Sequence, residues 1–183
     1  SFKDGRFEKC IEIGEKLLED PKQKEVSDIS KIVGESYFNL KKYKEALPYL
    51  KAYKGKRSKW NNTDYYQLGY AYYKQNDFEN AVKNFNKIIG EKNSISQNAY
   101  YHLAECYLYL EKKPEALNAF KSASEMNFDK KIKEDAFLNY AKLSYEQGNP
   151  YKSVADVLQD FLTAYPRSAS YNEINQLVVT SFL

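Results

Sequence analysis

The fold of this chain is decided by the stretch Tyr65–Ile89, which reads YYQLGYAYYKQNDFENAVKNFNKII. Its apolar residues recur at the i, i+3, i+4 spacing on both sides of the polar break Gln75–Asp77, which is typical of two short amphipathic helices. A hairpin of helices this short cannot bury its own apolar faces, so it requires similar hairpins as neighbours. The stretch therefore predicts one unit of a stacked helical array.

The rest of the chain repeats this hairpin with a constant period. The small residue of the second helix recurs as Ala46, Ala81 and Ala116, and each step is 35 residues (81 − 46 and 116 − 81). The apolar residue of the first helix follows the same period, at Val33, Leu68 and Leu103. A period of this length is typical of helical-hairpin solenoids.

The repeat resembles the tetratricopeptide-repeat family, whose pattern is strongest in the central hairpin. The matching residues there are Tyr65, Leu68, Gly69, Tyr72, Phe78, Ala81 and Phe85. The resemblance implies an all-α, right-handed superhelical solenoid of antiparallel helix hairpins. The small residues Gly34, Gly69 and Ala104 are expected where only a small side chain lets the paired helices approach closely.

The whole chain, 1–183, is predicted to be a single array and a fragment of a longer protein. Its expected parts are a second half-unit at 3–21, repeats at about 27–60, 62–95, 97–130 and 132–168, and a first half-unit at 169–183. The small position steps by 38 residues from Ala116 to Val154. We assign this change to a longer loop near 128–133 and to an extra residue at Pro150. Pro48 predicts a late helix start or a kink.

The N-terminal half-unit at 3–21 should pack through one face of a single helix. Phe7, Cys10, Ile11 and Leu17 occupy the expected packing positions, whereas Gly14 stands where the family usually has an aromatic residue. We therefore expect thin packing around Gly14. Cys10 and the second cysteine, Cys106, match no metal or redox spacing and are interpreted as small buried residues.

No arrangement of residues in the sequence points to catalysis, a cofactor or a bound metal. His102 is the single histidine and has no nucleophile or second ligand near it in the sequence, so it is interpreted as a surface or interface side chain. Phosphate-binding loops, HExxH and paired CxxC motifs are absent from the sequence. Four glutamates at helical spacing, Glu8, Glu12, Glu15 and Glu19, indicate a solvated acidic face. The chain is predicted not to be an enzyme.

The resemblance points instead to a binding groove, because first helices line the concave surface in this family. The positions carried over are Lys31, Glu35, Phe38, Tyr66, Tyr70, Tyr73, Tyr101, Glu105, Leu108, Tyr109, Leu138, Lys142 and Tyr145. Tyrosine offers a large rigid contact area with a hydrogen-bonding tip, as interaction hot spots do. We predict that the groove recognises a peptide or protein segment; the alternative is that some of these tyrosines pack between helices.

One family subclass binds C-terminal carboxylates through lysine and asparagine at inner positions. Here Glu35, Tyr70 and Glu105 stand in place of its asparagine, and Tyr66 and Tyr101 in place of its lysine. Negative and phenolic groups cannot replace cationic donors for a carboxylate. The sequence therefore disfavours that binding mode.

Two alternative functions have a sequence basis. The stretch Lys51–Trp60 carries five cations beside Tyr53 and Trp60, a composition suited to nucleic acid or another anionic polymer, although a solvated loop has the same composition. The net charge of +3 makes nucleic acid an improbable partner for the rest of the chain. The second alternative is self-association, or contact with further repeats, through the apolar residues of the last helix, Ile174, Leu177, Val178, Phe182 and Leu183.

The cellular location rests on one short resemblance. The segment Phe161–Ser168 is similar to repeat endings in bacterial cell-envelope tetratricopeptide proteins. It favours the periplasm or an outer-membrane-associated location over the cytoplasm. No run in the sequence approaches the ~18 apolar residues that a membrane span needs.

Overall fold

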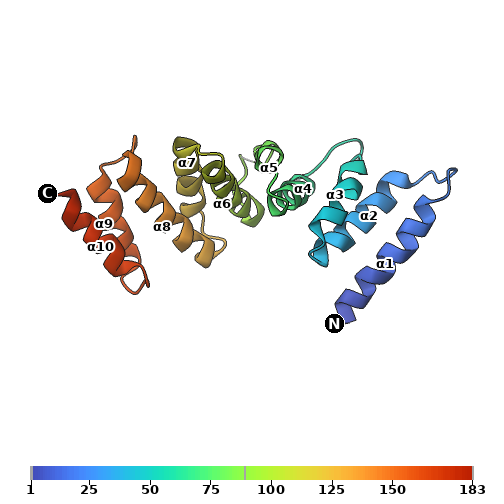
Figure 1. The fold of residues 1–183 in the computed structure, drawn as a ribbon, viewed down its shortest axis with the longest axis horizontal. Helices are drawn as coiled ribbons and strands as arrows, with labels where there is room; N and C mark the ends of the chain where they lie inside the picture. The colour runs from blue at the N-terminus through green and yellow to red at the C-terminus, as the bar shows by residue number, and fades with distance from the viewer. Residues whose placement is uncertain (1, 89, 183) are drawn as a thin grey trace. The chain divides into compact units, whose positions relative to one another are not determined.

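The computed structural model describes residues 2–88 and 90–182, and those residues fold into helices joined by short loops (Figure 1). The chain divides into two compact units: unit 1 ends at Ile88 and unit 2 follows it. Unit 1 contains α1 (Phe2–Leu18), α2 (Val26–Asn39), α3 (Tyr43–Ala52), α4 (Asn62–Lys74) and α5 (Phe78–Phe85). Unit 2 contains α6 (Ser94–Tyr109), α7 (Lys113–Ser124), α8 (Lys130–Gln147), α9 (Val154–Ala164) and α10 (Tyr171–Ser181).

Within each unit, consecutive helices form antiparallel pairs that stack on the next pair. In unit 1, α2 packs against α1, α3 and α4, and α4 packs against α5. In unit 2, α7 lies between α6 and α8, and α8 contacts α9 and α10 as well. The cores of the hairpins consist of the repeat residues, and Val33, Ala81 and Ala116 are fully buried. The predicted all-α helix-hairpin fold is confirmed.

Three of the hairpin turns have the same backbone geometry. Lys41, Asn76 and Glu111 each adopt a positive φ, of 60°, 59° and 58°. In each turn the next residue donates its N–H to a tyrosine carbonyl five residues earlier, at 2.7 to 3.0 Å, as in the Schellman motif. The three turns are 35 residues apart, so the backbone conformation of the turn repeats with the same period as the sequence pattern.

The fourth hairpin differs in its turn. Between α8 and α9 the loop runs from Gly148 to Ser153, whereas the corresponding loop between α6 and α7 runs from Leu110 to Lys112. The prediction of extra length near Pro150 is confirmed, but the predicted longer loop at 128–133 is wrong. Asp129 caps α8 by accepting the N–H groups of Lys131 and Ile132 at 2.9 and 3.0 Å, so the helix already begins at Lys130.

Close helix approach at glycine is confirmed for two repeats. A Cβ atom placed on Gly34 would lie 2.9 Å from the backbone nitrogen of Leu50, and one on Gly69 would lie 2.9 Å from the Phe85 ring. The expectation of thin packing at Gly14 is wrong. A Cβ atom there would lie 2.3 Å from Val33 Cγ2, because α2 approaches α1 at this point.

Two further details of unit 1 depart from the sequence predictions. Helix α3 begins at Tyr43 and runs through Pro48, so the predicted late start is wrong. Of the predicted packing residues in α1, Ile11 is buried, whereas Cys10 and Leu17 are exposed. The reason is that α2 covers one narrow face of α1, which is centred on Ile11 and Gly14.

Cys106 is buried as predicted, and burial raises the pKa of its thiol to about 12.

The acidic face of α1 is not wholly solvated. Glu15 accepts hydrogen bonds from the Tyr37 hydroxyl at 2.6 Å and from the Tyr49 hydroxyl at 2.9 Å. The two rings stack with their centroids 5.7 Å apart. One carboxylate therefore connects α1 to α2 and α3, whereas the neighbouring Glu8, Glu12 and Glu19 are exposed as predicted.

Candidate functional site

The predicted groove residues of unit 1 form a packed aromatic cluster around Tyr70. The centroid of its ring lies 5.7 Å from that of Phe38 and 5.8 Å from those of Tyr66 and Tyr73. Tyr43, which the groove prediction did not include, completes the cluster at 5.3 Å. The rings are half-buried. These residues therefore pack on one another and also present the outer faces of their rings.

Several tyrosines of unit 1, inside and outside this cluster, give the protein a pH dependence in the alkaline range. The hydrogen bond to Glu15 raises the pKa of Tyr37, and burial raises the pKa values of Tyr43, Tyr49 and Tyr66. In the unfolded chain these phenols ionise near pH 10, whereas the folded protein holds their protons to higher pH. The unfolded state thus releases protons first, and the free energy of unfolding should fall as the pH rises above 10.

Absorbance of tyrosinate against pH measures this effect directly. We expect a group of tyrosines to titrate later in the folded chain than in urea. We also expect the urea midpoint to decrease above pH 10. Identical titration curves for the folded and unfolded chains would contradict the prediction.

Lys31 and Glu35, also predicted for the groove, take part in an ion-pair network within unit 1. Lys31 Nζ lies 3.1 Å from Oδ1 of the buried Asp64 and 3.9 Å from Oε1 of Glu35. Burial lowers the pKa of Lys31, but the hydrogen bond and the charge of Asp64 outweigh it and the pKa is raised. Asp64 also accepts the N–H of Asn61 at 2.9 Å, which closes a capping box at the start of α4. Lys31 therefore holds α2 against α4.

In unit 2, the predicted groove residues gather around Tyr101 on α6. Its hydroxyl donates to Asp135 Oδ2 on α8, and its ring meets the buried Phe120 of α7 edge-on, 5.9 Å between centroids. Asn139 donates to the Asp135 carbonyl at 2.8 Å and supports the same carboxylate at 3.4 Å. The tyrosine thus connects three helices and has one fixed orientation.

Two adjacent pockets share Tyr101 as a common wall. The first has a volume of about 470 Å³ and is lined by Tyr101, Lys131, Ile132, Glu134, Asp135, Leu138 and Ser168–Ser170. The second has a volume of about 430 Å³ and is lined by Tyr101, Glu105, Leu108, Tyr109, Phe120 and Asn139. Five predicted groove residues are therefore brought together: Tyr101, Glu105, Leu108, Tyr109 and Leu138. We call the two pockets the α8 pocket and the α7 pocket, and together the unit 2 groove.

The remaining predicted residues of unit 2 lie outside both pockets. Lys142 pairs with Glu173 at 2.7 Å, and the Tyr145 hydroxyl lies 3.1 Å from Thr180 Oγ1. Both partners are on α10, so these side chains hold α8 to the last helix.

The sequence prediction also missed several residues of the α8 pocket. Asp135 lies one helical turn before Leu138, and that spacing could have indicated it. The loop Ser168–Ser170 joins the pocket only through the packing of α10 on α8, and nothing in the local sequence pattern indicates this.

His102 lies beside two residues of the unit 2 groove. Its Nδ1 atom lies 2.8 Å from Glu105 Oε2, and its ring meets Tyr101 edge-on at 5.5 Å. Among residues 2–88 and 90–182, no cluster of three or more His, Cys, Asp or Glu side chains could hold a metal ion. In the same residues, none of the helices has both the length and the apolar character that crossing a bilayer requires.

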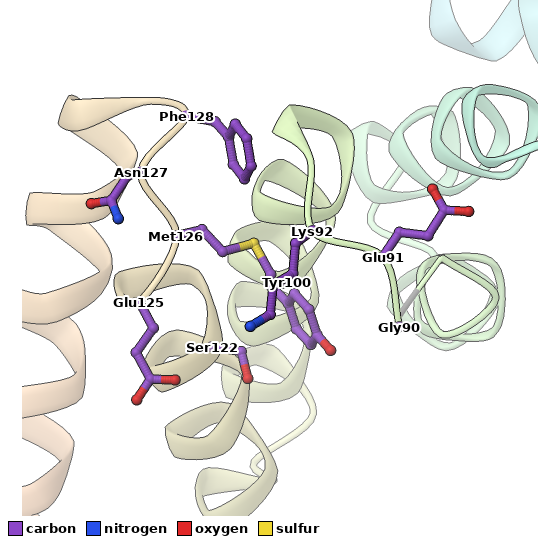
Figure 2. Close-up of a pocket in the computed structure, with 9 residues that line it drawn as sticks. All are labelled: Gly90, Glu91, Lys92, Tyr100, Ser122, Glu125, Met126, Asn127 and Phe128. Carbon is purple, nitrogen blue, oxygen red and sulfur yellow. The ribbon is translucent and has the colours of Figure 1, made fainter.

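A separate pocket of about 440 Å³ lies on another face of unit 2, between the residues before α6 and the α7–α8 loop (Figure 2). Figure 2 shows Met126 beside Tyr100, with Phe128 on the loop above them. Its charged residues are of both signs, Glu91, Lys92 and Glu125. The lining contains none of the predicted groove residues and no convergent set of like charges, so it indicates no particular ligand.

The basic stretch Lys51–Trp60 forms a tight turn whose aromatic residues face inward. The Trp60 indole N–H donates to the Tyr53 carbonyl at 2.8 Å, and Tyr53 is buried under Lys31, whose Nζ lies 4.5 Å from the ring centroid. Trp60 also packs against Tyr65 at 5.2 Å. The rings are therefore occupied within unit 1 and are not displayed for base stacking, although the cations of the turn are exposed.

The last described helix exposes a different apolar set from the one predicted for self-association. Ile174 is fully buried within unit 2, so it packs α10 and cannot belong to an exposed surface. Leu177 and Val178 are half-buried, whereas Val179 and Phe182 are 50% and 75% exposed. Leu183 lies outside the described residues.

Comparisons with known proteins agree with the hairpin architecture. The family model of the anaphase-promoting complex, cyclosome, subunit 3 matches residues 50–123. No curated protein is similar enough in sequence to count as a relative.

Solved structures of similar fold span nearly the whole chain. The structure of MamA is 18% identical over 97% of this chain and 91% of that chain, with a TM-score of 0.64. YrrB, described as a TPR protein with an unusual peptide-binding site, is 18% identical over 97% of this chain and 84% of its own, with a TM-score of 0.67. The MamA MSR-1 C2 structure is 19% identical over 97% and 90%, with a TM-score of 0.59. At these identities the likeness shows the fold alone.

Proposed function

We propose, from its membership of the tetratricopeptide-repeat family, that this chain is a non-catalytic scaffold that binds an extended peptide or protein segment in the tyrosine-rich unit 2 groove. The repeat pattern, the family-model match and the solved TPR structures of similar fold support the assignment. Hairpin arrays of this kind act as interaction scaffolds, since stacking leaves a continuous surface along their first helices.

The observation that carries the proposal is that Tyr101 lines two pockets, of about 470 and 430 Å³. Its hydroxyl is held by Asp135 and its ring by Phe120, so the wall between the pockets is pre-organised. Both pockets have mostly apolar walls with a few polar groups, which is typical of sites that bind a ligand side chain. The peptide-binding description of YrrB supports a peptide as the class of ligand.

We include the aromatic cluster of unit 1 in the proposal as a second contact surface. Substitutions in this cluster would not separate an effect on binding from an effect on stability. Tyr66 and Tyr70 stack on each other, and Tyr66 also lies 6.0 Å from the buried Phe85 ring. Replacing them with alanine would leave cavities and lower stability together with binding. The exposed Tyr109 and the half-buried Leu108 of the α7 pocket reduce this difficulty.

Replacing Leu108 and Tyr109 together with alanine should weaken peptide binding at least tenfold. Both side chains line the α7 pocket, and Tyr109 is 66% exposed, so its truncation removes contact area and little packing. The probe is a set of peptides selected on the wild-type chain from a library of random linear peptides, and fluorescence anisotropy measures their affinity.

The matched control is Tyr151→Ala, which removes a tyrosine of similar exposure, 58%, from outside the groove. It should leave affinity unchanged within about twofold, as is usual for residues outside an interface. Peptides that bind the Leu108/Tyr109 variant as tightly as the wild type would refute the groove assignment.

We also propose a bacterial cell-envelope location, on the narrower support of the Phe161–Ser168 ending. Two aromatic residues of that ending pack on α8, with Phe161 and Tyr165 at 5.6 and 6.0 Å from the Phe137 ring. Packing alone therefore accounts for part of the resemblance. Fractionation of cells that contain the full-length protein tests the proposal, and recovery in the cytosolic fraction alone would contradict it.

A further inference from the structure

We propose that the unit 2 groove selects segments in which a basic side chain lies within two residues of an apolar one. This inference rests on the proposed function, since it names the kind of segment that the groove accepts. The apolar side chain would enter the α7 pocket, and the lysine or arginine would enter the α8 pocket beside Glu134 and Asp135.

The α8 pocket is lined by charged side chains. Two of them are the carboxylates of Glu134 and Asp135, and Lys131 is the cation among the lining residues. Within the described ranges, 2–88 and 90–182, the Glu134 side chain accepts no hydrogen bond and forms no ion pair; its electrostatic neighbour is Tyr165, whose pKa is raised by burial and by this carboxylate. Lys131 lines the same pocket, and Lys130 and Lys133 line a neighbouring one with Glu134. The pocket therefore holds a carboxylate that none of these lysines pairs with directly.

Two polar groups orient the carboxylate of Asp135. Its partners are the Tyr101 hydroxyl and the Asn139 amide, which orient the carboxylate and leave its negative charge in place. Glu105, which lines the α7 pocket, adds a third carboxylate, and its Oε2 atom lies 2.8 Å from His102 Nδ1. The nearby Lys142 is paired with Glu173. The groove thus carries an excess of negative charge beside apolar walls.

A bound segment has to satisfy these carboxylates when it displaces water. A neutral side chain would leave them desolvated without a partner, and a carboxylate or phosphate would bring repulsion in addition. A guanidinium or ammonium group supplies charge-assisted donors to carboxylates. Charge complementarity therefore favours a basic side chain in the α8 pocket.

The spacing of the two side chains follows from the shared wall. Tyr101 lines both pockets, so the two occupants would each contact this one residue. In an extended segment, side chains two residues apart point to the same side and lie about 7 Å apart. A segment of the form apolar–x–basic, or the reverse, places one side chain in each pocket.

The test is selection from a library of random linear peptides on the wild-type chain and on the Glu134→Gln, Asp135→Asn double variant. These substitutions keep the shape of both side chains and remove their charge. We expect Lys or Arg within two residues of an aliphatic or aromatic residue to be enriched on the wild type and not on the variant. The variant should bind the wild-type-selected peptides about tenfold more weakly, as should peptides whose Arg is exchanged for Gln.

A matched control separates pocket charge from the overall charge of the chain. The double variant Glu115→Gln, Asp156→Asn removes the same net charge from exposed positions on α7 and α9 and should bind like the wild type. Loss of the basic preference in this control would overturn the inference.

The remaining outcomes distinguish the inference from the proposed function. Enriched peptides without a basic preference, whose binding is nevertheless lost in the Leu108→Ala, Tyr109→Ala variant, would refute the inference and leave the proposed function standing. Enrichment of acidic residues would also refute it. Failure to enrich any peptide that depends on Leu108 and Tyr109 would refute both.

Discussion

Replacing Gln97 with leucine is expected to lower the free energy of unfolding of unit 2 by about 3 kcal/mol or more. The side chain is fully buried, and its amide nitrogen donates to the carbonyls of Ala123, Met126 and Asp129 at 3.2, 2.8 and 3.3 Å. Its carbonyl oxygen accepts the Asp129 N–H at 2.7 Å. Leucine has a similar volume but leaves the Met126 carbonyl and the Asp129 N–H without a partner, whereas the Ala123 and Asp129 carbonyls still accept the N–H groups of Met126 and Lys133. Each buried unpaired group costs about 1–3 kcal/mol.

Urea unfolding measures this change, and hydrogen exchange at the Asp129 amide locates it. The exchange should accelerate, because this N–H loses its acceptor. The matched control is Gln159→Leu, an exposed position on α9, which should change stability by less than about 0.5 kcal/mol. Equal urea midpoints for the Gln97 variant and the wild type would show that the α7–α8 loop does not depend on this side chain.

Replacing Gly34 with alanine is expected to lower the free energy of unfolding of unit 1 by about 2 kcal/mol. The added methyl group would lie 2.9 Å from the backbone nitrogen of Leu50 and 2.9 Å from its Cδ2 atom. A side chain could rotate away, but the backbone of α3 moves only if the whole hairpin opens. The strain therefore outweighs the gain in helix propensity that alanine brings.

The same substitution at Gly5 provides a control of opposite sign. This glycine lies in α1 and has no atom within 4 Å of the position that a Cβ would take. Gly5→Ala should therefore raise stability by about 0.5 kcal/mol through helix propensity alone. If both variants were stabilised to the same extent, α2 and α3 would not require a residue without a side chain at their crossing.

Only some of the features behind these predictions could be predicted from the sequence. The period, the hairpins and the small residue at Gly34 follow from local patterns, because apolar spacing and the need for close approach act within a few residues. Gly14 was misjudged because the family pattern shows which residue is usual at a position, and not which neighbour approaches it. Gln97 has partners 26 to 32 residues away, and no local pattern indicates such a connection.

The residues of the candidate site likewise include some that could be predicted from the sequence and some that only the structure shows. The family resemblance pointed to Tyr101, Glu105 and Leu108 as groove residues, and their spacing is consistent with one helix face, because side chains three and four residues apart share a face whatever the tertiary structure. Asp135 and the Ser168–Ser170 loop reach the pocket only through the packing of α8 and α10. The charge of the α8 pocket, on which the peptide preference depends, therefore required the structure.

The three Schellman turns carry a consequence for how such repeats can vary. A lysine, an asparagine and a glutamate, Lys41, Asn76 and Glu111, adopt the same left-handed backbone within two degrees of φ. A position that accepts a cation, an amide and an anion alike imposes no electrostatic requirement on its occupant. The charge of the residue at these turns can therefore change by mutation without altering the backbone geometry that joins the two helices.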